Sequence, residues 1–199
     1  MARYTGPVTR KSRRLKVDLV GGDQAFERRP YPPGQHGRGR VKESEYLLQL
    51  QEKQKARFTY GVLERQFRGY YDEAARRQGK TGDNLLQLLE ARLDNTVYRL
   101  GIAPSRPAAR QLVTHKHIMV NGVVVNVPSF ELRPGDVIGL KESAQGNTGI
   151  TSQIRGKNAK INWLDWSEAE FQGTFIALPE RESVPENIKE QLIVELYSK

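Results

Sequence analysis

The chain has 199 residues, 37% of them hydrophobic, which is enough to bury one compact core or two small ones. No run of about 18 apolar residues predicts a transmembrane helix. No apolar stretch follows the charged start, so we expect neither a membrane protein nor a secreted one. The absence of cysteine excludes disulfides, cysteine-ligated zinc and thiol catalysis, and it agrees with a cytoplasmic location.

Positive charge is concentrated near the N-terminus. Lysine and arginine number 32 against 23 acidic residues, a formal net charge of +9. Residues 1–42 alone hold 11 basic and 3 acidic residues. Such a segment is either a solvated tail or an arm that becomes ordered against a polyanion.

This basic segment is rich in residues that favour turns. The stretches "TRKSRRLK" and "RRPYPPGQHGRGR" bury too little apolar surface to offset their own ordering entropy. We therefore predict an extended arm whose glycines allow close approach to phosphates and whose arginines bind them with paired donors. Its candidate RNA contacts are Arg10, Lys11, Arg13, Arg14, Arg38 and Arg40.

Amphipathic helices are predicted after the arm. Ser44 is a suitable N-cap for a helix to about residue 58, Gly61 interrupts it, and a second helix is predicted over 62–77. Asp83 is expected to cap a third helix over 84–100, and Ser105 a shorter fourth one. Basic side chains on or near the exposed faces of the first two helices are further candidates: Lys53, Lys55, Arg57 and Arg65.

Short strands are predicted in the second half. "HIMVNGVVVNV" is typical of a hairpin, because both residues of its Asn121-Gly122 turn need positive φ. A turn at residues 134–136 precedes a strand over 137–140, and "WLDW" and "GTFIALPE" predict others. Residues 145–160 are predicted to form a mobile linker, and the chain closes on an apolar segment.

The corner between the fourth helix and the hairpin carries His115, Lys116 and His117. Two histidines without a carboxylate or thiol at ligand spacing make a poor metal site. No nucleophile elbow or phosphate loop supports catalysis. Plain surface histidines and contacts to nucleic acid remain as alternatives.

We expect Arg92 and Arg110 to share one surface with this corner. A compact cluster of donors with little aromatic surface suits the phosphates and 2′-hydroxyls of folded RNA better than splayed bases. Replacing Arg110 and Lys116 by alanine is therefore expected to weaken RNA binding without unfolding the chain.

These motifs resemble a known family. "RLDN", "ARQLV", "VNG" and "PGD", in order between about residues 92 and 140, resemble the S4 RNA-binding module. "PPGQHG", "EKQKARFTYGVLERQFRGYY" and "EQLIVELYSK" are similar to the bacterial small-subunit ribosomal protein S4 family. The resemblance runs almost end to end and weakens over about residues 143–176. Many members hold zinc through cysteines in the arm, and this arm has none, so we expect no metal and no cofactor.

The resemblance implies an α+β protein in three parts. A basic N-terminal arm, 1–42, precedes a helical domain, 43–91, which the C-terminal tail, 183–199, completes. The RNA-binding domain, 92–182, with its module core at 92–150, is inserted into the helical domain. That module consists of two helices and a small antiparallel sheet.

The function implied by the resemblance is not enzymatic. It is a structural constituent of the small subunit that binds 16S-type ribosomal RNA at a multi-helix junction, nucleates assembly and contributes to translational accuracy where messenger RNA enters. Expected partners are these RNAs and neighbouring proteins of the S5 and S3 families, with no membrane and no homo-oligomer. Some members repress translation of their own messenger RNA. An RNA-modifying enzyme or a free-standing regulator is the alternative, although the enzyme would need a further catalytic domain.

Overall fold

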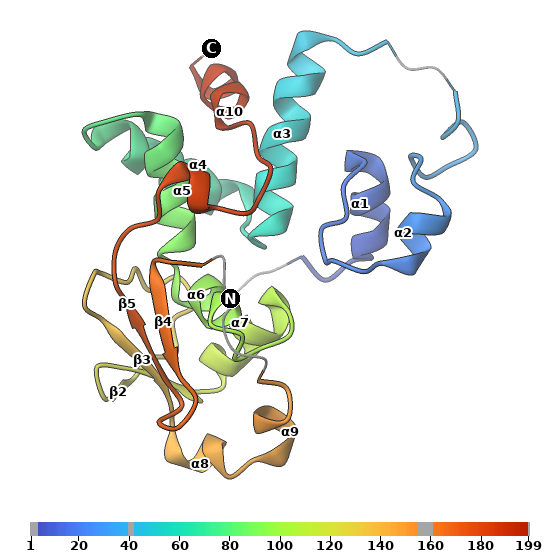
Figure 1. Cartoon of the computed structure of the whole chain (residues 1–199). Helices are drawn as coiled ribbons and strands as arrows, with labels where there is room; N and C mark the ends of the chain where they lie inside the picture. Colours follow the sequence, from blue (N-terminus) through green and yellow to red (C-terminus); the bar gives the residue numbers. More distant parts are fainter. Residues whose placement is uncertain (1–3, 40–41, 155–160, 199) are drawn as a thin grey trace. The chain divides into compact units, whose positions relative to one another are not determined.

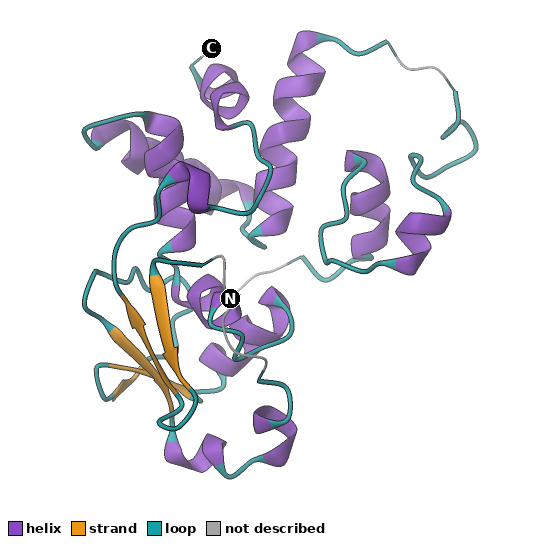
Figure 2. Ribbon diagram, in the orientation of Figure 1, coloured by secondary structure: helices purple, strands orange, loops and turns teal. Residues whose placement is uncertain are grey.

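The computed structural model describes residues 4–39, 42–154 and 161–198, and the chain forms two compact units (Figure 1). One unit runs to Gly82 and resumes at Asn187, and the other is Asp83–Glu186. All strands of the described chain lie in the second unit, as Figure 2 shows, so the mixed helical and antiparallel fold class is confirmed. The helices of the first unit are α1 (Val8–Leu15), α2 (Gln24–Arg28), α3 (Glu45–Thr59), α4 (Glu64–Arg76) and α10 (Glu190–Tyr197).

The framework of the first unit consists of α3, α4 and α10. The Ser44 hydroxyl accepts a hydrogen bond from the backbone N–H of Leu47 at 3.2 Å, so α3 begins at its predicted cap. α10 packs against α3, and the ring of Tyr197 lies 4.7 Å from that of Tyr71 on α4. The apolar segment that closes the sequence is therefore a helix of this unit.

The arm contains two short helices that the sequence did not predict. The carboxylate of Asp18 accepts backbone N–H bonds from Val20, Gly21 and Asp23 and so fixes the turn after α1. Burial raises the pKa of Asp18, but these bonds outweigh it and the pKa is lowered. The side chain of Asp23 then caps α2. Hydrogen bonds from side chain to backbone produce no hydrophobic periodicity in the sequence. The sequence pattern therefore did not predict α1 and α2.

The "PPGQHG" stretch forms its turn for a steric reason. Gly34 has a φ of +105°, and a Cβ on Gly37 would lie 1.9 Å from the carbonyl oxygen of Pro32. The backbone of the arm itself therefore requires both glycines. Close approach to a phosphate is not needed to explain them.

The second unit begins with helices and continues into a sheet. The third helix of the sequence prediction is in fact two helices, and Asp83 lies in the first turn instead of capping it. The elements of this unit are α5 (Thr81–Glu90), α6 (Leu93–Arg99), α7 (Arg106–Thr114), β1 (Ile118–Val120), β2 (Val123–Val124), β3 (Val137–Leu140), α8 (Glu142–Gln145), α9 (Thr148–Thr151), β4 (Leu164–Ser167), β5 (Gln172–Phe175) and the 3₁₀ turn Arg181–Ser183.

A tertiary pairing explains the break between α5 and α6. The backbone N–H of Leu93 donates to the carbonyl of Phe130 at 2.9 Å. The N–H of Leu132 donates to the carbonyl of Ala91 at 2.8 Å. The chain is extended where these bonds form, and this extended segment ends α5 before α6 begins. The helical spacing of the leucines nevertheless continues through the break, so the sequence predicted one helix.

α7 ends in a Schellman motif. Its N-cap is the predicted Ser105, whose hydroxyl accepts the N–H of residue 108. At the other end, the N–H of His117 donates to the carbonyl of Leu112 at 3.1 Å, and the N–H of Lys116 donates to that of Val113 at 3.0 Å. Lys116 has a φ of +64°, in the left-handed position that glycine usually fills. The corner with the histidines is thus a rigid helix end.

The sheet has the strand order β2-β1-β3-β5-β4 and is antiparallel throughout. Asn121 and Gly122 form the predicted turn, with φ of +50° and +80°. The Asn121 side chain also donates to Asp136 at 2.8 Å and accepts the N–H of Val137 at 2.9 Å. The two predicted turns are therefore joined to each other.

Both helices that follow α5 cover one core with the sheet. α6 and α7 pack against each other, and their apolar side chains lie in one cluster with those of the strands. This arrangement fixes the end of α7 beside β1. Members of the cluster include Leu93, Val97, Leu100, Val113, Ile118, Ile138, Leu140, Leu164 and Phe175.

Part of the predicted mobile linker is ordered, which corrects that prediction for residues 145–154. α8 ends at Gln145 and α9 forms within this range, and the Asn147 side chain caps α9 by accepting the N–H of Gly149 at 2.9 Å. Ala144 is buried, and Ile150 packs against the core. Helices of four residues are too short to show a period in the sequence. The rest of the predicted linker, 155–160, lies outside the described residues.

The limits of the second unit differ from the predicted boundaries after residues 91 and 182. Glu186 belongs to this unit because its carboxylate pairs with Arg99 and Arg106. Glu90, at the end of α5, also pairs with Arg99, at 2.6 Å. In the described parts of the chain, no helix is long and apolar enough to cross a membrane.

Candidate nucleic-acid interface

Four basic side chains gather in the first unit, where α1 packs against α3. We call them the arm cluster: Arg10, Lys11 and Arg14 of α1, and Arg57 of α3. Arg10, Lys11 and Arg14 line a pocket of about 410 Å³. Lys11, Arg14 and Arg57 line a second pocket of about 250 Å³. Lys11 and Arg14 line both pockets.

The charges of α1 are not compensated within the described chain. Arg10 and Arg14 are one turn apart, a spacing at which like charges repel and destabilise a helix. No described carboxylate forms an ion pair with Arg10, Lys11 or Arg14, and α1 contains no acidic residue. An external polyanion would relieve this repulsion.

Aromatic rings contact two members of the arm cluster, Lys11 and Arg57. The ammonium of Lys11 lies 5.2 Å from the ring centroids of both Tyr4 and Phe58. The guanidinium of Arg57 lies 4.4 Å from the centroid of Phe58. Cation–π contacts position a cation without neutralising it, so Lys11 keeps its charge for a ligand. Arg57 also pairs with Glu64, at 3.9 Å.

Arg13 and Arg38 have a different role in the structure. Both guanidinium groups lie over the ring of Tyr31, at 5.1 and 4.8 Å from its centroid. Arg13 also donates to the backbone carbonyl of Tyr31 at 3.1 Å. The two arginines therefore stabilise the arm, and Arg38 remains exposed. The sixth arm candidate, Arg40, lies outside the described residues.

The remaining candidates on α3 and α4 differ in exposure. Lys53 is buried and pairs with Glu64 at 2.5 Å, so its first role is to join α3 to α4. Lys55 is largely covered and pairs with Glu52. Arg65 is exposed, as the sequence predicts.

Glu64 connects three helices of the first unit. It accepts hydrogen bonds from Lys53 on α3 and from the Tyr197 hydroxyl on α10, the latter at 3.0 Å. Burial raises the pKa of Glu64, but these bonds and the charges of Lys53 and Arg57 outweigh burial, so the pKa is lowered. For Tyr197, burial and the neighbouring Glu64 carboxylate raise the pKa.

We expect the Glu64→Gln variant to lose a pH-dependent part of the stability of this unit. A lowered carboxyl pKa contributes stability that is complete above the ordinary value of 4.5 and is lost as the pH falls through the lowered pKa. The stability difference between wild type and variant should therefore shrink below about pH 4.5 when helix unfolding is followed by circular dichroism. Asp72→Asn, an exposed change on the same helix, is the control. A difference that does not vary with pH would contradict the role of Glu64.

Arg92 and Arg110 are not on the surface, which corrects the expectation for them. Arg92 is 1% exposed and forms a bidentate pair with Asp94, at 3.0 and 2.7 Å. Arg110 is also buried and donates to the same carboxylate at 3.3 Å. Asp94 is two residues from Arg92, and Arg110 reaches it from α7. Their role in the structure is to lock α6 to α7.

A second buried network lies beside this one. Arg99 pairs with Glu90, which is fully buried, and with Glu186. Arg106 pairs with Glu186 and donates to Asn95 at 2.8 Å. Arg99 and Arg106 are therefore held in ion pairs within the second unit.

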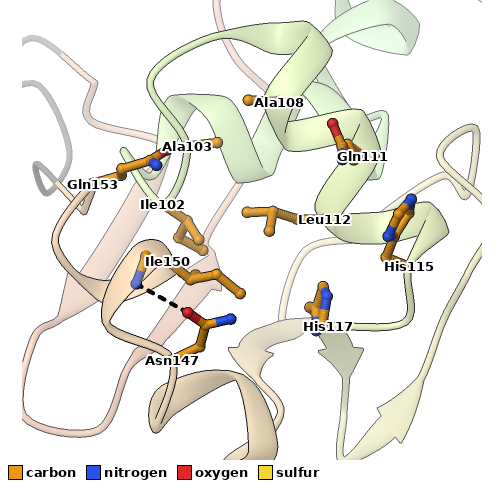
Figure 3. A pocket seen from close by; sticks show the side chains of 11 residues that line it. Ile102, Ala103, Ala108, Gln111, Leu112, His115, His117, Asn147, Ile150 and Gln153 are labelled. Atoms are coloured by element: carbon orange, nitrogen blue, oxygen red, sulfur yellow. Dashed lines mark hydrogen bonds between the residues drawn. The ribbon is translucent and has the colours of Figure 1, made fainter.

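The corner at the end of α7 is exposed, with His117 partly covered. His115 and His117 have ring centroids 6.3 Å apart and line a pocket of about 290 Å³ (Figure 3). Lys116 is not part of the pocket lining. Among residues 4–39, 42–154 and 161–198, no three His, Asp or Glu side chains lie close enough to hold a metal ion.

Sequence reasoning missed the partners of the basic residues. Tyr31, Tyr4 and Phe58 place four of the predicted cations, yet only the position of Tyr31 between prolines and arginines offered a signal. It also missed Asn147 and Gln153, which line the pocket at the histidines. Nothing in their local pattern marks them, because α9 brings them there.

The sequence of the chain matches two protein-family models and is similar to known proteins. Residues 3–90 match the family described as "Ribosomal protein S4/S9 N-terminal domain", and residues 91–138 match the "S4 domain". The chain is similar to proteins named "Small ribosomal subunit protein uS4" over 100% of its own length and of theirs. Identity is 63% for the protein of Saccharopolyspora erythraea, 60% for that of Nocardia farcinica and 58% for that of Cytophaga hutchinsonii.

Proposed function

Because the chain belongs to the small ribosomal subunit protein uS4 family, we propose that it is a structural constituent of the small ribosomal subunit and binds ribosomal RNA. Identity of 58–63% over the full length of relatives with that name carries the proposal. The arm cluster supports it, because Arg10, Lys11 and Arg14 form no ion pair within the described chain and favour a polyanion.

The proposed mechanism divides the work between the two units. The arm cluster, together with Arg38 and Arg65, neutralises phosphates and supplies most of the affinity. The corner with His115, Lys116 and His117 adds contacts from the second unit, and the buried Arg92 and Arg110 keep its helices in place. Phosphate contacts fix register and orientation on a folded RNA without reading its sequence.

The finer expectations follow from the family. We propose that the chain binds 16S-type RNA at a multi-helix junction, nucleates assembly of the subunit and contributes to accuracy where messenger RNA enters. Proteins of the S5 and S3 families are its expected neighbours. Repression of its own messenger RNA is a further expectation. The division into arm, helical domain and inserted domain is proposed in the same way.

The alternative, an RNA-modifying enzyme or a free-standing regulator, is not favoured. The two family matches cover residues 3–138, and relatives named for the small subunit align with the whole chain. A non-enzymatic role is the simpler proposal.

Sedimentation of cell extract tests the proposal. We expect nearly all of the protein to co-sediment with the small subunit, and purified protein to bind transcribed small-subunit RNA without other proteins. A protein found largely outside the ribosomal fractions would contradict the role as a constituent. A free-standing regulator would be found largely outside the ribosomal fractions and would still bind RNA.

A further inference from the structure

The pocket at the end of α7 is distinct from the arm cluster and has a different character. Figure 3 shows His115 and His117 on the side of α7 and β1, with Asn147, Ile150 and Gln153 on the opposite side. Leu112 lies between them. Planar imidazole rings around an aliphatic surface suit a flat heterocycle better than a tetrahedral phosphate.

Electrostatics also disfavour a phosphate at this place. The C-terminal end of a helix carries the negative end of the helix dipole, which disfavours an anion. Among the residues that the structure describes, those that line the pocket include no lysine and no arginine. A neutral, polar and planar group is the ligand that this combination accepts.

We propose that this pocket takes up a single unpaired nucleobase of the ribosomal RNA, stacked against the imidazole rings and held at its edge by side-chain amides. Sequence-specific recognition of RNA commonly uses splayed bases stacked on aromatic side chains, histidine included. The volume of about 290 Å³ is at the small end for ligand sites, as one base requires. This inference rests on the proposed function, and it revises the expectation that the corner suits phosphates better than bases.

The base edge meets side chains that have unused hydrogen-bonding groups. Asn147 accepts the N–H of Gly149 through Oδ1, so its Nδ2 is left as a donor. No described group bonds to the side-chain amide of Gln111 or Gln153. We therefore expect the base to present an acceptor to Asn147, while the two glutamines can serve either kind of edge.

The pocket is preorganised, which lowers the entropy cost of binding. The Schellman bonds hold His117 against the end of α7, and its carbonyl accepts the N–H of Lys141 at 2.9 Å. Leu112 and His117 are the residues that such a motif brings into contact. A stacking surface fixed by backbone bonds requires little ordering when the base enters.

Binding and base-specific footprinting test the proposal. The probe is full-length transcribed small-subunit RNA, with dimethyl sulfate and a carbodiimide to report on base edges and hydroxyl radicals to report on the backbone. We expect wild-type protein to protect the base edge of at least one unpaired nucleotide. His115→Ala/His117→Ala, and separately Gln111→Trp, which fills the pocket from an exposed position, should abolish that protection. Each should weaken binding roughly 10- to 100-fold, the usual effect of losing one stacked base.

Matched controls separate the pocket from the surrounding surface. Thr114→Trp puts the same ring on an exposed position of α7 outside the pocket and should leave the protection intact. Asn147→Asp keeps the cap of α9 but replaces the donor by an acceptor, and should reduce affinity more than Asn126→Asp, the same charge change elsewhere. Thermal unfolding of each variant confirms that it is folded.

The outcomes distinguish this inference from the function on which it rests. If wild type binds the RNA but the pocket variants keep its affinity and its base protections, the pocket proposal is overturned and the function stands. If these variants lose a protein partner and no RNA contact, the pocket has a different ligand and the proposal is also overturned. If wild type fails to bind the RNA at all, both proposals fail.

Discussion

The Arg92→Ala variant is expected to destabilise the second unit by about 3–5 kcal/mol, the usual cost of removing one partner of a buried ion pair. The side chain is 1% exposed, and both of its bonds to Asp94 are within 3.0 Å. Its removal leaves a cavity and a carboxylate whose remaining ion-pair partner is Arg110, at 3.3 Å. Urea unfolding followed by tryptophan fluorescence measures the effect, because both tryptophans, Trp163 and Trp166, belong to the second unit.

Two further variants calibrate this result. Arg65→Ala, at an exposed position on α4, should change stability by no more than about 0.5 kcal/mol. Arg110→Ala should destabilise the second unit in the same direction as Arg92→Ala, because Arg110 is buried as well. Arg110 is therefore unsuitable for testing RNA contacts, contrary to the expectation from the sequence. A loss below about 1 kcal/mol for Arg92→Ala would show that the pair is dispensable.

Local chemistry explains which parts of the fold could be predicted. Ser44 and Ser105 cap helices through their own hydroxyls, and Asn121-Gly122 forms a hairpin turn through its own φ values. Each feature needs only neighbours in sequence. The break between α5 and α6 depends instead on pairing with Phe130 and Leu132, which no local pattern announces.

The same distinction applies to the candidate site. Arg10 and Arg14 of α1 were predicted from composition, and both are exposed. Arg92 and Arg110 have the same charge, yet their pairing with Asp94 makes them interior residues. Composition reveals the sign of a charge. Whether a basic side chain can contact RNA depends on which carboxylates the fold places beside it. The pocket at His115 was not predictable either, because one of its walls is α9.

Salt should weaken the binding of the RNA by about 10³-fold or more between roughly 50 and 200 mM, if about six phosphates are neutralised. The structure supports a number of this size. Three predicted contacts are buried: Lys53, Arg92 and Arg110. The basic side chains that remain exposed or partly exposed include the arm cluster, Arg38, Arg65 and Lys116. Filter binding over a salt series gives the slope of log affinity against log salt concentration.

A variant that lacks two charges of the arm cluster shows which side chains cause the salt dependence of RNA binding. Arg10→Ala/Arg14→Ala should reduce its magnitude by about 2, since each phosphate contact contributes about 0.9. It should also leave the protein folded, because the two side chains form no ion pair with the described chain and repel each other within α1. Arg76→Ala, at a side chain 80% exposed on α4, should leave the slope unchanged. Equal effects of the two variants would mean that net charge, rather than the arm cluster, attracts the RNA. A flat salt response in wild type would exclude phosphate neutralisation as the main source of affinity.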